Sequence, residues 1–414
     1  MATLTAPSPI AAAEAALAPV WAAIDQTTHV NQKKVLQAFK DHQIGEQHFA
    51  GTTGYGHGDL GREALEAVFA QIMGAEAALV RQQFASGTHA LAVALFGALR
   101  PGDELLSIAG APYDTLEEVI GLRGENQGSL MEWGVTYREL PLTPEGRVDM
   151  DAIPGALRPE TKVITIQRSR GYDWRPSLRV EEIGAIIRLV KTLRPDIICF
   201  VDNCYGEFTE TLEPPQVGAD LIAGSLIKNP GGGIVPIGGY VAGRADLVHR
   251  AACRLTAPGI GREGGASLDL NRLLFQGLFL APHTVAEALK GATLAARLFH
   301  DLGYPVDPAW DAPRTDIIQA VKLGSAEKLV ALCRGIQEWS PVNSYVRPEP
   351  DIVPGYADNV VMAGGTFIEG STLELSADGP LREPYVAYLQ GGLTYSHCRI
   401  ALEAVLERMK EVEA

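Results

Sequence analysis

The fold is decided by two stretches of sequence, Val201-Asp202-Asn203-Cys204-Tyr205-Gly206-Glu207-Phe208 and Ser225-Leu226-Ile227-Lys228-Asn229-Pro230-Gly231-Gly232-Gly233. Apolar runs that predict strands, 197–202 and 221–227, end within them. The first run is apolar on both faces, which is typical of a mostly parallel sheet covered by helices on both sides. Doubly wound sheets bind ligands outside the carboxyl ends of their strands, so we expect Asp202 and Lys228 to face one cleft.

Helices and strands alternate on either side of these stretches, which predicts an α/β fold with a mostly parallel, doubly wound sheet. Helices are expected at residues 62–73, 88–99, 115–120 and 180–193. The remaining strands of the sheet are expected at residues 77–81, 104–108, 135–140, 163–167 and 239–242.

The two ends of the chain show a different pattern. Residues 11–23 and 32–40 are expected to form two amphipathic helices. Beyond residue 280, helices at 285–302, 326–339 and 394–409 are mixed with short strands at 317–321, 360–362 and 373–375. We therefore expect an N-terminal helical arm (1–51), a large α/β domain (52–280) and a small C-terminal α+β domain (281–414).

Composition and charge restrict the function. The chain has 414 residues, 46% of them hydrophobic, and its net charge of −15 repels nucleic-acid backbones and anionic lipid. Its five cysteines include no C-x-x-C pair, which indicates reduced thiols and gives no support for a metal site. No lysine or arginine precedes Lys33, and the apolar stretch 10–24 is shorter than the ~20 residues that span a bilayer. We expect a cytoplasmic protein with no nucleic-acid, membrane or metal partner.

An amine and an acid that face one cleft are typical of a pyridoxal 5′-phosphate (PLP) site. In such a site a lysine forms a Schiff base with the cofactor, and a carboxylate keeps the pyridine nitrogen protonated so that the ring accepts electrons. Lys228 and Asp202 match these two roles. A buried ion pair at the strand ends is the structural alternative.

A PLP site also needs a phosphate cup. Ser86, Gly87 and Thr88 stand where an expected strand passes into an expected helix, and the free N–H groups and dipole of a helix start favour an anion. Ser225, three residues before Lys228, would add a hydroxyl group to the same phosphate. A Ser-Gly-Thr run is by itself only an N-cap signature, so its weight comes from its combination with Asp202 and Lys228.

These motifs resemble those of fold-type I PLP enzymes of the cystathionine and methionine γ-lyase group. The resemblance is to the branch that comprises the methionine γ-lyase family and aluminium-resistance proteins, and it covers nearly the whole chain. The segments that carry it are Tyr55-Gly56-His57-Gly58-Asp59, Ser86-Gly87-Thr88-His89-Ala90, Asp202-Asn203, Ser225 to Gly233 and Gln390-Gly391-Gly392-Leu393-Thr394-Tyr395.

The resemblance implies PLP as the cofactor and a role for each motif. Lys228 would form the Schiff base, Asp202 would lie beneath the pyridine nitrogen, and Tyr113 would stack on the ring. The phosphate would be held by Gly87, Thr88 and Ser225. Aminotransferases of this fold place a tyrosine against the cofactor's phenolic oxygen three residues after the aspartate, where this chain has Tyr205 and the γ-lyase group usually has another residue.

Tyr55 and His57 match a Tyr-x-Arg pair that, in the γ-lyase group, reaches the phosphate of the neighbouring subunit, with histidine in place of the arginine. The resemblance therefore implies a homodimer or homotetramer with shared active sites.

The segment Gly379-Pro380-Leu381-Arg382-Glu383-Pro384-Tyr385 resembles the one whose arginine grips the substrate α-carboxylate, a task suited to a bidentate guanidinium. A solvated loop arginine is the alternative for Arg382, and Arg168 and Arg170 compete with it. The glycine-rich loop 258–265 is either a mobile lid or a plain connector.

These observations predict a PLP-dependent carbon–sulfur lyase that acts on a sulfur-containing amino acid by β- or γ-elimination, in the manner of methionine γ-lyase or cystathionine β-lyase. Lys228 would take the Cα proton, and Tyr55 or Tyr113 would assist proton transfer to the leaving sulfur. The alternatives are an aminotransferase or another amino-acid lyase of the same fold, or a weakly active PLP-binding regulatory protein. Cys204 is expected to be a buried structural thiol.

Overall fold

The computed structural model describes residues 8–352 and 358–413. The chain forms two compact units, Asn31–Ala281 and Met1–Val30 with Pro282–Ala414. This grouping differs from the three expected segments because two long helices, α1 (Pro9–Asp41) and α8 (Asn271–Asp301), each contribute to both units. Within the described ranges, no helix combines the length and the apolar character needed to cross a membrane.

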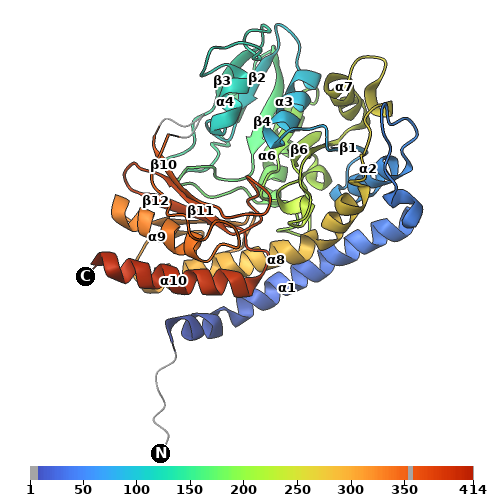
Figure 1. The fold of residues 1–414 in the computed structure, drawn as a ribbon. Coiled ribbons are helices and arrows are strands. Elements are labelled where there is room, and N and C mark those ends of the chain that lie inside the picture. Colours follow the sequence, from blue (N-terminus) through green and yellow to red (C-terminus); the bar gives the residue numbers. More distant parts are fainter. Residues whose placement is uncertain (1–7, 353–357, 414) are drawn as a thin grey trace, which may run out of the picture. The chain divides into compact units, whose positions relative to one another are not determined.

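A seven-stranded sheet with the order β1-β7-β6-β5-β4-β2-β3 forms the centre of the larger unit (Figure 1). β2 through β6 pair in parallel, whereas β7 is antiparallel to both β1 and β6. The carboxyl ends of β4, β5 and β6 consequently lie at one edge of the sheet. The strands are β1 (Ala77–Arg81), β2 (Glu104–Ser107), β3 (Thr136–Glu139), β4 (Thr161–Gln167), β5 (Ile198–Asp202), β6 (Leu221–Ser225) and β7 (Gly239–Gly243).

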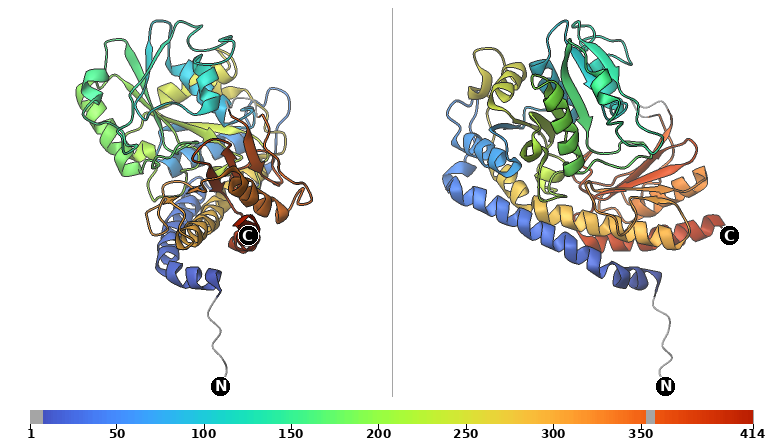
Figure 2. Two further views of the ribbon diagram at one scale, coloured as in Figure 1. Left: turned by 90° about the vertical axis from the view of Figure 1, so that its left-hand side faces the viewer. Right: turned by 180° about the vertical axis from the view of Figure 1, so that it is seen from behind.

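Helices cover both faces of this sheet. On one face, α3 (Gly87–Ala98), α4 (Asp114–Ile120) and α7 (Ala245–Leu255) share an apolar core with strand residues such as Val241. The neighbouring residue Tyr240 points to the opposite face, where Phe69 of α2 (Leu60–Met73) contacts it with ring centroids 4.8 Å apart. α6 (Val180–Leu193) covers this second face (Figures 1 and 2). The short helices are η1 (Glu46–Phe49), α5 (Ile153–Ala156), η2 (Pro214–Val217), η3 (Asn229–Gly231) and η4 (Gly261–Glu263).

The smaller unit contains a five-stranded antiparallel sheet with the order β10-β11-β12-β9-β8. α9 (Ala326–Glu338) and α10 (Tyr395–Glu413) share a core with one face of this sheet and with the start of α1 and the end of α8, in which Leu17 and Leu294 are fully buried. The strands are β8 (Val306–Asp307), β9 (Ile318–Lys322), β10 (Val360–Ala363), β11 (Ser376–Pro380) and β12 (Val386–Gln390).

The predicted α/β class with a large, mostly parallel sheet is confirmed, and a separate smaller sheet is present. The prediction of two N-terminal helices is wrong, because α1 is continuous from Pro9 to Asp41. Thr28 is accommodated between the two expected helices by a bond from its hydroxyl group to the carbonyl oxygen of Ile24 (2.8 Å), a local bond that satisfies the side chain inside a helix.

Two further boundaries differ from the prediction. α8 begins at Asn271 instead of residue 285, because the buried side chains of Leu274 and Leu278 carry its packing through Pro282. Residues 373–375 form no strand, because the carboxylate of Glu374 accepts the N–H groups of Phe367 and Ile368 (2.8 and 2.9 Å) and closes a loop.

Candidate active site

The two decisive stretches meet at the carboxyl ends of β5 and β6. Asp202 is the last residue of β5 and pairs with Ala223 of β6, and Lys228 follows the end of β6. Asp202 is 7% exposed, and its Oδ1 accepts the N–H of Cys204 (3.1 Å). Burial raises the pKa of Asp202, although the nearby Lys228 ammonium acts in the opposite direction. The acid and the amine therefore belong to one electrostatically coupled cluster.

Lys228 is held against an aromatic ring. Its Nζ lies 3.9 Å from the centroid of the Tyr205 ring, a cation–π contact. Burial by itself lowers the pKa of Lys228, but the acidic groups of Cys204, Tyr205 and Asp202 outweigh this effect and raise it. Cys204 is buried, and burial raises the pKa of its thiol, as expected of a structural cysteine.

The start of α3 has the form of an anion site. Ser86 is the N-cap residue, and its hydroxyl oxygen accepts the N–H of His89 (3.1 Å). The first bond within the helix runs from the N–H of Ala90 to the carbonyl of Ser86 (3.2 Å), so the amides of Gly87 and Thr88 precede the helical bonding pattern. Such amides are the groups that bind phosphate at a helix start.

Gly87 brings this helix start close to β6. A Cβ atom at Gly87 would lie 3.1 Å from the Cβ of Ser225 and 3.7 Å from the Sγ of Cys204. The expected cup residues are thus neighbours in space, and the glycine leaves room beside them. The residues present fit the phosphate group of PLP.

Tyr113 lies at the same edge of the sheet. It is the N-cap residue of α4, whose first turn is joined to that of α3 by a bond between the hydroxyl groups of Thr88 and Thr115 (2.9 Å). A Cβ atom at Gly171, in the loop after β4, would lie 3.6 Å from Cδ2 of Tyr113. The ring is therefore next to the strand ends, and its stacking role stays a prediction.

The structure argues against Arg168 as the substrate-binding arginine. Arg168 is fully buried; its Nη1 donates to Oδ1 of Asn203 (2.7 Å) and lies 3.4 Å from the carboxylate of Glu213. A Cβ atom at Gly206 would lie 2.4 Å from its Cδ, so the glycine admits this close packing. Arg168 fixes the turn after β5. Arg170 is also buried, and its role stays a prediction.

Arg382 lies between β11 and β12 in the smaller unit. Its side chain is 52% exposed, and Nη1 lies 3.1 Å from the Asp358 carboxylate. A half-exposed pair of this kind contributes little to stability, so Arg382 is not required by the fold. Its role toward substrate stays a prediction.

Tyr55 and His57 lie on the surface of the larger unit. Tyr55 is 79% exposed, and its ring stacks on that of His57 at a centroid distance of 5.7 Å. The adjoining loop 258–265 is fixed by buried Arg81, whose guanidinium donates to the carbonyl oxygens of Gly264 and Arg262 (2.6 and 2.8 Å). These hydrogen bonds restrain the loop and favour its role as a plain connector over that of a mobile lid.

Sequence reasoning missed Glu207, which belongs to the same cluster. It is fully buried, and its Oε1 accepts the hydroxyl group of Tyr240 (2.7 Å). Burial raises the pKa of Glu207 to about 8, so the carboxyl is mostly protonated at neutral pH. Its place within the 201–208 stretch could have identified Glu207 from the sequence. A carboxyl group so close to the end of a buried strand must be either ion-paired or neutral.

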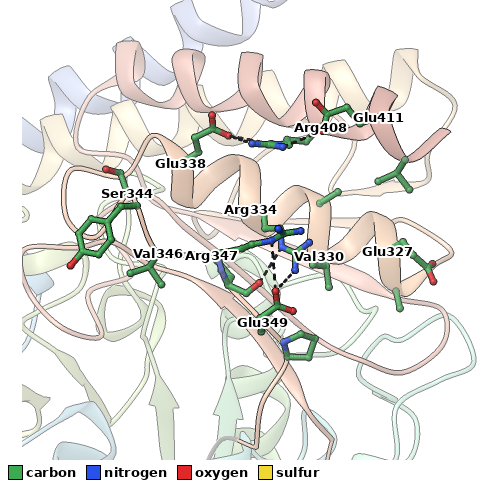
Figure 3. A pocket seen from close by; sticks show the side chains of 16 residues that line it. Glu327, Val330, Arg334, Glu338, Ser344, Val346, Arg347, Glu349, Arg408 and Glu411 are labelled. Carbon is green, nitrogen blue, oxygen red and sulfur yellow. Dashed lines mark hydrogen bonds and ion pairs between the residues drawn. The ribbon is translucent and has the colours of Figure 1, made fainter. Parts of the chain in front are cut away.

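A pocket of about 630 Å³ on the smaller unit is an alternative site. It is lined by α9, α10 and residues 344–350. Figure 3 shows Arg334 and Arg347 directed at Glu349, and Arg408 directed at Glu338 and Glu411. These arginines are paired with carboxylates, and the lining includes none of the predicted site residues, so we do not place the active site there.

The larger sheet and its strand-end residues define a class of protein. The mixed α/β fold with its large, mostly parallel sheet is similar to that of fold-type I PLP enzymes. Residues 7–410 match the family model for methionine gamma-lyase. The chain therefore belongs to the methionine γ-lyase family. The predicted enzyme class, a PLP-dependent carbon–sulfur lyase, and the predicted cofactor are confirmed.

Individual relatives agree with this assignment. The uncharacterised protein YnbB of Bacillus subtilis is 52% identical over 399 residues, 96% of this chain and 95% of YnbB. A crystal structure from Listeria monocytogenes, of a candidate cystathionine beta-lyase involved in aluminium resistance, has a TM-score of 0.95 and 51% identity and covers 97% of this chain and 99% of that one. L-Methionine gamma-lyase of Pseudomonas putida is 30% identical over 237 residues, 55% of this chain and 48% of that enzyme.

Proposed function

We propose that this protein cleaves the carbon–sulfur bond of a sulfur-containing α-amino acid by β- or γ-elimination. The observation that carries the proposal is the meeting of Lys228, Asp202 and the α3 helix start at one edge of the sheet. The names of the relatives, methionine γ-lyase and cystathionine β-lyase, support sulfur amino acids as the substrate class.

Lys228 is the proposed attachment point of the cofactor and the proposed base. Bound PLP supplies an electron sink that makes the Cα proton of an attached amino acid acidic. Once substrate has displaced it, the Lys228 amine takes the Cα proton on Nζ, and the Tyr205 ring beneath this nitrogen stabilises the resulting positive charge.

Asp202 is the proposed partner of the cofactor's ring nitrogen. A buried carboxylate without a cation is unfavourable, so a protonated ring nitrogen beside it would keep Asp202 ionised and would itself stay protonated. Tyr113 is proposed to pack on the ring, and Tyr205 lies near the amine. The proposed phosphate ligands are Ser86, Gly87, Thr88 and Ser225.

The leaving sulfur needs a proton, because a neutral thiol is a better leaving group than a thiolate. Tyr113, beside the strand ends, and Tyr55, supplied by a neighbouring subunit, are the proposed donors. In β-elimination, one proton is removed from Cα and one is returned to sulfur as the Cβ–S bond breaks. In γ-elimination, a proton is also removed from Cβ before the Cγ–S bond breaks, and one is later added at Cγ. In both cases water then releases the 2-oxoacid and ammonia.

The test is a panel of L-methionine, L-homocysteine, L-cystathionine and L-cysteine incubated with the PLP-loaded protein. Equal amounts of ammonia, 2-oxoacid and released sulfur product are expected from at least one of them; the sulfur product is a thiol from methionine or cystathionine and hydrogen sulfide from cysteine or homocysteine. Pyruvate from cysteine identifies β-elimination, and 2-oxobutyrate from methionine identifies γ-elimination. A 2-oxoacid formed without ammonia, and only with an amino-group acceptor, would show an aminotransferase instead. No product at all would favour a regulatory protein.

Arg382→Ala is expected to raise KM for the amino acid by about 10- to 100-fold, because a charged hydrogen bond to the α-carboxylate is lost. Arg382→Lys should rescue poorly, since an ammonium cannot form the bidentate contact. The absorbance of bound PLP should stay unchanged. Arg408→Ala is the control, because Arg408 is similarly exposed (44%) and also ion-paired. Equal KM values in Arg382→Ala and wild type would move the carboxylate site elsewhere, with Arg170 next.

We also propose a homodimer or homotetramer whose sites are completed by Tyr55 and His57 of a neighbouring subunit, which agrees with their exposure. Tyr55→Ala and Lys228→Ala should each turn over substrate far more slowly than wild type when assayed alone. After subunit exchange the mixture should regain activity, because one site of each mixed pair contains both native residues. A fully active monomer, or no recovery in verified mixed oligomers, would contradict shared sites.

A further inference from the structure

We infer that Asn229 is a positioning residue that holds the Tyr205 ring against the amine of Lys228. The inference deepens the proposed function and rests on it, because it concerns how the chain prepares the nitrogen that takes up the Cα proton. Asn229 directly follows Lys228, so a single backbone segment carries both the amine and the group that fixes the ring beneath it.

Asn229 reaches from the end of β6 to the turn after β5. Its side chain is fully buried, and its Nδ2 donates to the carbonyl oxygens of Tyr205 and Glu207, both at 2.9 Å. Tyr205 has a φ of 72°, a left-handed conformation that is uncommon for a tyrosine and persists only where surrounding contacts impose it. The bond to the Tyr205 carbonyl is such a contact.

A second asparagine holds the same turn farther along. Asn31 of α1 is also fully buried, and its Nδ2 donates to the carbonyl oxygens of Phe208 (2.9 Å) and Glu210 (3.0 Å). Each of the two amides thus donates a pair of hydrogen bonds to backbone carbonyl oxygens of the same turn. Of these two amides, the one that bonds the carbonyl of Tyr205 is that of Asn229. A comparison of substitutions at Asn229 and Asn31 therefore distinguishes local positioning of the Tyr205 ring from general stabilisation of the turn.

The position of the ring has an electrostatic consequence. The face of an aromatic ring stabilises a positive charge on the nitrogen above it. The titratable groups with the largest effects on the pKa of Lys228 are Cys204, Tyr205 and Asp202, all from the β5 end and its turn. Loss of the Asn229 amide removes one of the contacts that impose the left-handed conformation of Tyr205. A shift of the ring away from Lys228 then weakens the support for the charged form of the nitrogen.

The experiment compares full-length Asn229→Ala and Asn31→Ala with wild type, each loaded with PLP. The thermal midpoint should fall by a similar amount in both variants, because each loses two buried bonds. Only Asn229→Ala should move the pH midpoint of the bound-PLP absorbance, downward by about 0.5–1 unit, the size of a cation–π contact. Hydrogen exchange of the cofactor-free protein should show earlier opening at residues 203–207 in Asn229→Ala than in Asn31→Ala.

Each result has a defined meaning. An unchanged pH midpoint in Asn229→Ala, or equal shifts in both variants, would overturn the positioning role. If Asn229→Ala does not fold, Asn229→Ser and Asn31→Ser keep one donor each and are compared in the same way. A wild-type protein that binds PLP but cleaves no sulfur amino acid would refute the proposed function alone, because this comparison uses absorbance and hydrogen exchange.

Discussion

Lys228→Ala is expected to give a folded protein that binds PLP only reversibly and turns over amino acids about 10²–10⁴-fold more slowly, the usual contribution of a positioned base. The backbone N–H of Gly231 bonds to the Lys228 carbonyl oxygen (3.1 Å), a contact that alanine retains, so the turn after β6 should persist. Borohydride reduction followed by peptide mass spectrometry should locate PLP on Lys228 in the wild type and on no lysine in the variant.

Lys191→Ala is the matched control. Lys191 also has an aspartate partner, Asp220 at 2.6 Å, and it also lies in the larger unit. Its loss should lower stability slightly and leave PLP attached to Lys228. Attachment of PLP to a different lysine in reduced wild-type protein would refute the assignment of Lys228.

The larger sheet was predictable because its central strands are buried on both faces and therefore appear as continuous apolar runs, such as β5 (Ile198–Asp202). The small sheet was less so. β11 (Ser376–Pro380) is built from residues with low strand propensity and forms because β10 and β12 pair with it on either side. Its Asp378 is buried beside Gln390 (3.2 Å), a contact that no local pattern signals.

The same distinction holds at the candidate site. Asp202 and Lys228 could be proposed from sequence because each follows a recognisable strand, and strand ends converge in this kind of sheet. Arg168 also follows a strand and, from sequence alone, competes with Arg382 for the substrate, yet its contact with Glu213 commits it to the turn. Asn31 is far from that turn in sequence, and its bond to the Phe208 carbonyl depends on packing of α1 that periodicity does not specify.

Asp202→Asn is expected to keep PLP bound and to reduce turnover by about 100-fold or more. An amide cannot hold the cofactor's ring nitrogen protonated, and each unit by which that nitrogen's pKa falls corresponds to about 1.4 kcal/mol. The fold should tolerate the change, because burial raises the pKa of Asp202. In the cofactor-free protein, the pKa of Asp202 is higher in the folded state than in the unfolded state. The protein therefore loses stability as the pH rises from the unfolded-state pKa through the folded-state pKa, and the neutral asparagine should reduce this loss.

Asp220→Asn gives the opposite pattern and serves as the control. Asp220 is as buried as Asp202, at 7% exposure, but its carboxylate accepts the N–H of Cys199 (2.8 Å) and pairs with Lys191 and Arg244. Its substitution should lower the unfolding temperature and leave turnover within a few-fold of wild type. Thermal unfolding without PLP and steady-state kinetics with PLP should therefore rank the two variants in opposite orders. If Asp202→Asn retains turnover within a few-fold of wild type, Asp202 does not hold the ring nitrogen protonated, because its charge is then irrelevant to the rate.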